Sequence, residues 1–127
     1  MSDDGRISVF LCDDSSSLRK LVRLQLEDYP SLVFAGDAAG TGDCERLVAE
    51  LTPDIVLIDH GVVAERDPGA FLTRLRGSAP DALLVLFSGL PADLLEGDAV
   101  TWGADGFIHK DASASELAAS LMALAGA

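Results

Sequence analysis

The sequence predicts a doubly wound α/β fold, in which helices cover both faces of one parallel sheet. Strand-like segments recur five times, their starts lie 22–28 residues apart, and each interval is long enough for one helix. The segments 55–58 and 82–87 are unbroken apolar runs, a pattern typical of strands buried on both faces. Right-handed crossovers between such strands place helices on both sides of the sheet.

The first half of the chain predicts three strands and two helices. The strand 7–12 precedes serines that can cap a helix. That helix ends near Asp28, because the following Tyr29-Pro30 disfavours helical backbone. A strand at 32–36 leads to a helix that Thr41 opens, and Thr52-Pro53 ends this second helix before the central strand.

The second half continues the alternation after a loop from His60 to Gly69. A helix follows this loop, and Gly77 is expected to close it. Pro91 fits the first turn of the next helix, and Ser113 or Ser115 can cap the last one. The remaining expected elements are the strand 82–87, the helix ending near 102, the strand 106–108 and the helix 116–124.

Composition predicts one cytoplasmic domain over residues 1–127, with residues 1–5 flexible. The 127 residues are 49% hydrophobic, which is enough for a single core. The net charge of −12 argues against direct binding of nucleic acid. No apolar run approaches the roughly 18 residues of a membrane span, and the N-terminus lacks the basic start of a signal peptide. Cys12 and Cys44 are expected to be buried, reduced thiols.

Polar side chains stand where the predicted strands end. They are Asp13, Asp14, Asp59, Ser88 and Lys110. In a parallel sheet these ends share one edge, which is where ligands of open α/β folds bind. Three converging carboxylates repel one another unless a cation intervenes, and oxygen ligands suit a hard ion such as Mg²⁺. Lys110 is the one Lys or Arg after Gly77, in a stretch with seven acidic residues, which favours a specific counter-charge.

This arrangement is interpreted as a phosphoryl-transfer centre. Asp59 is the expected carboxylate nucleophile, which forms an acyl phosphate while the metal neutralises the shared charge. Lys110 and the Ser88 hydroxyl are expected to hold the remaining phosphoryl oxygens. An aspartate after a strand is also common as a helix cap or turn residue, so Asp59 alone would not carry the interpretation.

With these residues in place, the sequence resembles the receiver domain of bacterial response regulators in two-component signalling. The resemblance runs from Ile7 to about Leu124. It is carried by Cys12-Asp13-Asp14, Asp54-Ile55-Val56-Leu57-Ile58-Asp59, Leu86-Phe87-Ser88-Gly89 and Gly103-Ala104-Asp105-Gly106-Phe107-Ile108-His109-Lys110. It implies a flavodoxin-like sheet of order 2-1-3-4-5 with five helices. Two features depart from the usual pattern: Asp111 replaces a proline, and the 60–69 loop lacks Met-Pro.

The resemblance also implies the roles of individual residues. Mg²⁺, with Mn²⁺ as a substitute, would be held by Asp14, Asp59 and the backbone carbonyl of Gly61, and by Asp13 through water. A histidine kinase or phosphotransfer protein would phosphorylate Asp59. Self-phosphorylation and autodephosphorylation would be the chain's whole chemistry, so an enzyme in the usual sense is not expected.

The switch implied by the resemblance is a small rearrangement. The Ser88 hydroxyl would move toward the phosphoryl group, and Phe107 would turn inward with it. The partner that detects this change would be a downstream protein or a covalently linked output domain, and a homodimer is compatible with the Ala-rich last helix.

Three other functions remain open. A flavin-binding electron carrier would share the fold, but Asp13 and Asp14 would repel its phosphate. A phosphohydrolase with an aspartyl nucleophile would need a general acid that the sequence does not show. A phosphorylation-independent interaction module is the nearest alternative, and the intact set of site residues disfavours it.

Several residues near the site allow two interpretations. His60 and His109 are expected to line the mouth of the site, because two histidines without a third at ligand spacing argue against a metal role. Trp102 is expected either in the core or on the surface that relays the switch. The basic residues of the first helix form either a solvated face or a docking surface for an acidic partner; they are Arg19, Lys20 and Arg23.

Overall fold

Five strands and six helices alternate through residues 5–126, the part of the chain that the computed structural model describes. The expected flexibility of residues 1–5 concerns positions that, apart from Gly5, lie outside this part. The strands are β1 (Ile7–Cys12), β2 (Leu32–Ala38), β3 (Ile55–Asp59), β4 (Leu83–Ser88) and β5 (Gly106–His109). The helices are α1 (Ser16–Glu27), α2 (Thr41–Leu51), α3 (His60–Val63), α4 (Pro68–Ser78), α5 (Ala92–Trp102) and α6 (Ala114–Leu124).

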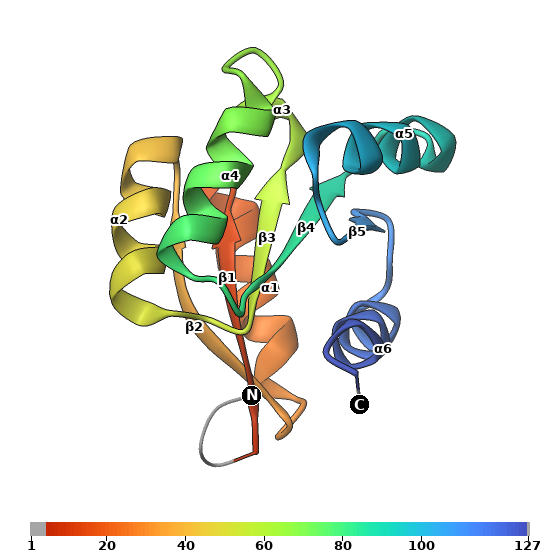
Figure 1. Cartoon of the computed structure of the whole chain (residues 1–127). Coiled ribbons are helices and arrows are strands. Elements are labelled where there is room, and N and C mark those ends of the chain that lie inside the picture. Colours follow the sequence, from red (N-terminus) through yellow and green to blue (C-terminus); the bar gives the residue numbers. More distant parts are fainter. Residues whose placement is uncertain (1–4, 127) are drawn as a thin grey trace.

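The strands form one parallel sheet in the order β2-β1-β3-β4-β5, which confirms the doubly wound fold and the order that the resemblance implies (Figure 1). Alternate residues of β3 point to opposite faces. Val56 and Ile58 pack with α2, α4 and α5, whereas Ile55 and Leu57 pack with α1 and α6. Every residue of β3 is buried, as its apolar run predicts.

The prediction of five helices is wrong by one, because part of the expected 60–69 loop forms the short helix α3. The cause is local: the Asp59 carboxylate accepts a hydrogen bond from the Val62 backbone N–H at 3.1 Å and caps the turn. This helix fixes the backbone immediately after the candidate nucleophile.

Several element ends also differ from the prediction by one or two residues. Strand β4 covers 83–88 rather than 82–87, β5 ends at His109 rather than at 108, and α6 begins at Ala114 rather than at 116. Gly77 does not close α4, because the helix continues to Ser78 and the Ala79 N–H still donates to the Leu75 carbonyl. Strand β2 runs two residues beyond the predicted 32–36, because Ala38 still pairs with Cys12 of β1. None of these changes alters the strand order.

Two further helix ends agree with the capping signals, whereas Pro91 is the residue before α5 and not part of its first turn. Gly103 ends α5 with a left-handed φ of +80°, and Ser113 rather than Ser115 caps α6, through a capping box with Glu116. Cys12 and Cys44 are buried free thiols, as expected. Among residues 5–126, each helix is too short or too polar to cross a bilayer.

Candidate functional site

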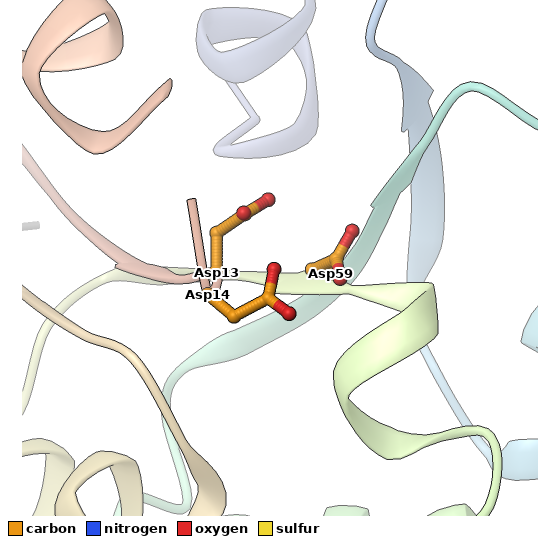
Figure 2. A group of neighbouring side chains, drawn as sticks. All are labelled: Asp13, Asp14 and Asp59. Atoms are coloured by element: carbon orange, nitrogen blue, oxygen red, sulfur yellow. The ribbon is translucent and has the colours of Figure 1, made fainter. Parts of the chain in front are cut away.

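Four neighbouring strands end in the side chains that the sequence singled out. Asp13 and Asp14 follow β1, Asp59 ends β3, Ser88 ends β4 and Lys110 follows β5. Because these strands are adjacent and parallel, their carboxyl ends lie at one edge of the sheet. Figure 2 shows the three aspartate side chains gathered at this edge.

The three carboxylates are close enough to share one cation. One oxygen from each of Asp13, Asp14 and Asp59 lies within 4.8 Å of the others. Asp13 is only 1% exposed and the Asp59 side chain 12%, whereas Asp14 faces solvent. Hard divalent cations prefer such oxygen donors, and a shared cation removes the repulsion among the charges. The donor set therefore fits a metal ion.

Lys110 places a positive charge between two of these carboxylates. Its Nζ donates to Asp13 Oδ2 at 2.7 Å and to Asp59 Oδ1 at 2.6 Å. Burial acts to lower the pKa of Lys110, but the hydrogen bonds to the two carboxylates outweigh it and raise the pKa above its ordinary value. The lysine is therefore charged, and it is the counter-charge that the sequence predicts.

Backbone donors orient the other oxygens of the two buried carboxylates. The Ser15 N–H donates to Asp13 Oδ1 at 2.9 Å, and the Val62 N–H donates to Asp59 Oδ2. Each carboxylate therefore has one oxygen on a backbone amide and the other on Lys110. Such double fixation holds the side chains in one rotamer, which suits a site that must present a particular oxygen.

Arg19 supports the site in a way that sequence reasoning missed. Its Nη1 donates to the Asp13 backbone carbonyl at 2.7 Å, and its Nε donates to Asp37 Oδ2 at 3.1 Å. This arginine therefore ties the backbone of Asp13 to α1 and to β2. The sequence predicted that Arg19 lies on a solvated or partner-binding face of α1. It gave no sign that the guanidinium turns inward to the backbone of Asp13, at the end of β1.

The turn after Asp59 passes directly beside the carboxylate. A Cβ added at Gly61 would lie 3.3 Å from Asp59 Oδ2, closer than most side chains tolerate. Glycine therefore suits this position, while the role of its carbonyl as a metal ligand stays a prediction. A hollow of about 320 Å³ opens beside it, lined by Asp14, Ala39, Gly40, Thr41, Gly61, Val62, Glu65 and Arg66.

The two expected switch residues lie on β4 and β5. Ser88 is buried, and its Oγ accepts from the Leu90 N–H at 3.1 Å. Its backbone carbonyl accepts from the Lys110 N–H, which ties the ends of β4 and β5 together. Phe107 is partly buried and packs against the core beneath α2, α4 and α5. Their movement on phosphorylation stays a prediction.

The rings of His60 and His109 have partners outside the carboxylate group. His60 Nε2 donates to Asp98 Oδ2 on α5 at 2.6 Å, and its ring lies 4.7 Å from that of Trp102. His109 Nδ1 accepts from the Asp111 N–H at 3.1 Å. Sequence reasoning expected His60 at the mouth and missed Asp98, which is 38 residues away; no local pattern signals that pair.

Fold and site together define a flavodoxin-like domain with an acidic site and a facing lysine at the carboxyl edge of its sheet. No protein-family model matches the chain. Response regulator GacA of Pseudomonas aeruginosa is 32% identical over 112 residues, which are 87% of this chain and 51% of GacA. A protein-glutamate methylesterase/protein-glutamine glutaminase of Cereibacter sphaeroides is 33% identical over 85 residues, 67% of this chain and 23% of that protein.

Solved structures agree with these relatives. A LuxR-family two-component response regulator from Aurantimonas sp. is 25% identical, with a TM-score of 0.79 over 95% of this chain and 86% of that one. The receiver domain of the putative response regulator NarL from Mycobacterium tuberculosis shares the fold, with a TM-score of 0.83, 22% identity and coverage of 95% and 97%.

The chain is therefore a receiver domain of the response-regulator family. It spans about half of GacA and about a quarter of the methylesterase. The site residues named from the sequence lie where the shared fold brings four strand ends together.

Proposed function

We propose that residues 1–127 form one receiver domain that works as a phosphorylation-controlled switch, with Asp59 as the phosphoacceptor. The observation that carries this proposal is the setting of Asp59. Its carboxylate is nearly buried, lies 2.6 Å from Lys110 Nζ and shares a 4.8 Å cluster with Asp13 and Asp14. A structural cap needs only the hydrogen bond to α3; it does not need a partly buried lysine and two further carboxylates.

The donor is a phosphohistidine of a histidine kinase or phosphotransfer protein. A carboxylate oxygen of Asp59 attacks phosphorus, the P–N bond breaks, and its electron pair leaves on the imidazole nitrogen. Asp13, Asp14, Asp59 and the Gly61 carbonyl would hold Mg²⁺, or Mn²⁺ in its place, and the bound ion would supply positive charge to neutralise the phosphoryl oxygens. The same site later hydrolyses the acyl phosphate, which is the limit of its chemistry.

Lys110 has two successive roles in this proposal. Before transfer it neutralises Asp13 and Asp59; after transfer its Nζ follows the new negative charge and donates to a phosphoryl oxygen. Ser88 supplies a second donor once its hydroxyl rotates away from the Leu90 N–H. Both residues are already within the site, so short movements of the two side chains and of the segment that carries Ser88 suffice.

The energy needed for switching is modest. Phosphorylation adds about −1.5 to −2 charge units at Asp59. Moving a population from 1:99 to 99:1 takes about 5.5 kcal/mol, and a hydrogen bond to a charged group contributes about 1.5–3 kcal/mol. Two or three new bonds from Lys110 and Ser88 therefore suffice, and Phe107 turns inward as Ser88 moves.

The response-regulator relatives support the proposed partners. The phosphodonor docks on α1, where Lys20 and Arg23 accompany the exposed Leu21 and Leu24. The phosphorylated state is detected by a downstream protein or a linked output domain. The acidic receiver itself does not contact nucleic acid. Pairing through α6 permits a homodimer. We place this phosphorelay in the cytoplasm.

Intact-protein mass spectrometry after incubation with acetyl phosphate and Mg²⁺ tests the proposal. We expect a gain of one phosphoryl group that disappears in Asp59→Asn and after removal of Mg²⁺ with a chelator. Asp81→Asn is the matched control, because Asp81 is exposed and does not belong to the carboxylate cluster. A gain that persists in Asp59→Asn would refute the assignment, and no gain from either acetyl phosphate or a phosphohistidine donor would favour a phosphorylation-independent interaction module.

A further inference from the structure

A short contact joins the turn after Asp59 to helix α5. His60 Nε2 donates to Asp98 Oδ2 at 2.6 Å, and the His60 ring is tilted 31° to the Trp102 ring at a centroid distance of 4.7 Å. Asp98 and Trp102 are four residues apart, so they project from one face of the helix. Figure 1 shows α3 beside α5, at the same end of the sheet as the candidate site.

This contact is more specific than a solvated surface pair. The His60 side chain is 14% exposed and that of Asp98 37%, so water competes only partly for the hydrogen bond. The ring contact restricts His60 from a second direction, and Trp102 packs against the core beneath α5. An interaction with two partners on one helix face constrains how that helix lies against the turn.

The contact lies between the phosphoacceptor turn and the segment that follows the switch residue Ser88. His60 lies between the phosphoacceptor Asp59 and Gly61, whose backbone passes the same carboxylate. Helix α5 begins at Ala92, four residues after Ser88. Any rearrangement of the Ser88 segment therefore moves the start of α5 relative to the turn that holds His60.

We propose that the His60–Asp98 hydrogen bond and the His60–Trp102 ring contact form a latch that holds α5 against the phosphoacceptor turn, and that phosphorylation of Asp59 releases it. The inference rests on the proposed function. The latch belongs to the arrangement seen here, in which Ser88 Oγ accepts from the Leu90 N–H. When Ser88 instead turns to the phosphoryl group, the 88–92 segment shifts, and a contact as short as 2.6 Å does not survive a shift of even one ångström.

The latch makes a directional prediction. A contact present only in the unphosphorylated arrangement opposes switching, so its removal raises the population that accepts a phosphoryl group. Asp98→Ala should therefore gain phosphate from acetyl phosphate faster than the wild type, by about fivefold, the lower end of typical coupling between sites. Asp98→Asn keeps an accepting oxygen but loses the charge, so its rate should be intermediate.

Trp102 reports on the latch directly, because it is the chain's one tryptophan. In the wild type its fluorescence should change when acetyl phosphate and Mg²⁺ are added. In Asp98→Ala the spectrum should already be shifted toward that of the phosphorylated wild type, and the further change should be largely lost. Glu96→Ala removes the same charge from an exposed position on the same helix and should behave as the wild type in both rate and spectrum.

Mass and fluorescence are measured on the same samples, so a failure of the latch can be distinguished from a failure of the proposed function. A wild type that gains a phosphoryl group without a change in Trp102 fluorescence would overturn the latch and leave the proposed function standing. Asp98→Ala with the rate and spectrum of Glu96→Ala would overturn it as well. A wild type that gains no phosphoryl group from either acetyl phosphate or a phosphohistidine donor would refute the proposed function, and the latch with it.

Discussion

Replacing Lys110 by methionine should destabilise the protein in metal-free buffer and leave it responsive to Mg²⁺. Methionine keeps most of the length of the side chain but removes the ammonium group, which donates to Asp13 at 2.7 Å and to Asp59 at 2.6 Å. The variant then holds two largely buried carboxylates, and Asp14 close by, without a cation. Their mutual repulsion is the source of the expected loss.

The magnitude lies between two limits. Exposed ion pairs contribute about 0–1 kcal/mol, and breaking a fully buried pair costs about 3–5 kcal/mol. The Lys110 side chain is 25% exposed while Asp13 is 1% exposed, so we expect a loss of about 2–3 kcal/mol in the free energy of unfolding. For a domain of this size that corresponds to a fall in Tm of roughly 6–15 °C.

Urea titrations with and without Mg²⁺ measure both parts of the effect. Because a divalent cation neutralises the same carboxylates, saturating Mg²⁺ should stabilise the variant more than the wild type and narrow the difference between them to less than about 1 kcal/mol. Lys20→Met is the control, since Lys20 is the other lysine of the chain and is exposed on α1. A Lys110→Met variant as stable as this control in metal-free buffer would refute the reasoning, as would equal stabilisation of variant and wild type by Mg²⁺.

Three further predictions concern the fold. Phe71→Ala, which empties a fully buried site, should lower the free energy of unfolding by about 3–5 kcal/mol in urea; a loss below 1 kcal/mol would show that the core collapses around it. Hydrogen bonding to Cys12 and burial both raise the pKa of the Cys44 thiol, so iodoacetamide should label it only in denaturant, and labelling of the native protein would contradict this. Burial acts to raise the pKa of Asp54, but hydrogen bonds from Ser8 outweigh it and hold the pKa below its ordinary value of 3.8. Asp54 therefore stabilises the fold above that pH, and the contribution is lost as the pH falls through the lowered pKa; Ser8→Ala should raise this pKa in an NMR titration, and an unchanged pKa would rule the argument out.

Local patterns predicted the ends of the expected elements to within two residues, and the larger errors have local physical causes. Glycine often ends a helix, but α4 packs on the sheet and continues past Gly77 to Ser78. The 60–69 segment has no apolar period of its own, so helix α3 was not expected; the Asp59 carboxylate caps it. Asp59, the candidate phosphoacceptor, is therefore also the residue that turns part of the expected loop into a helix.

The sequence by itself determined the strands, their parallel direction and the set of side chains at their carboxyl ends, whereas the order of the strands followed from the resemblance to receiver domains. Buried parallel strands require continuous apolar runs, and the residue after each run must then lie at one edge of the sheet. That rule is enough to place Asp13, Asp59 and Lys110 at the same edge of the sheet across gaps of 46 and 51 residues. No knowledge of side-chain rotamers was needed.

Only the tertiary structure decided which atoms meet within that site and around it. The turn of Arg19 toward the Asp13 carbonyl and the contact of His60 with Asp98 depend on how α1 and α5 lie on the sheet. These placements are set by packing of whole helix faces, and a shift of one or two ångströms would break either hydrogen bond. A sequence pattern records which face of a helix is apolar, but not its position along the sheet to that accuracy.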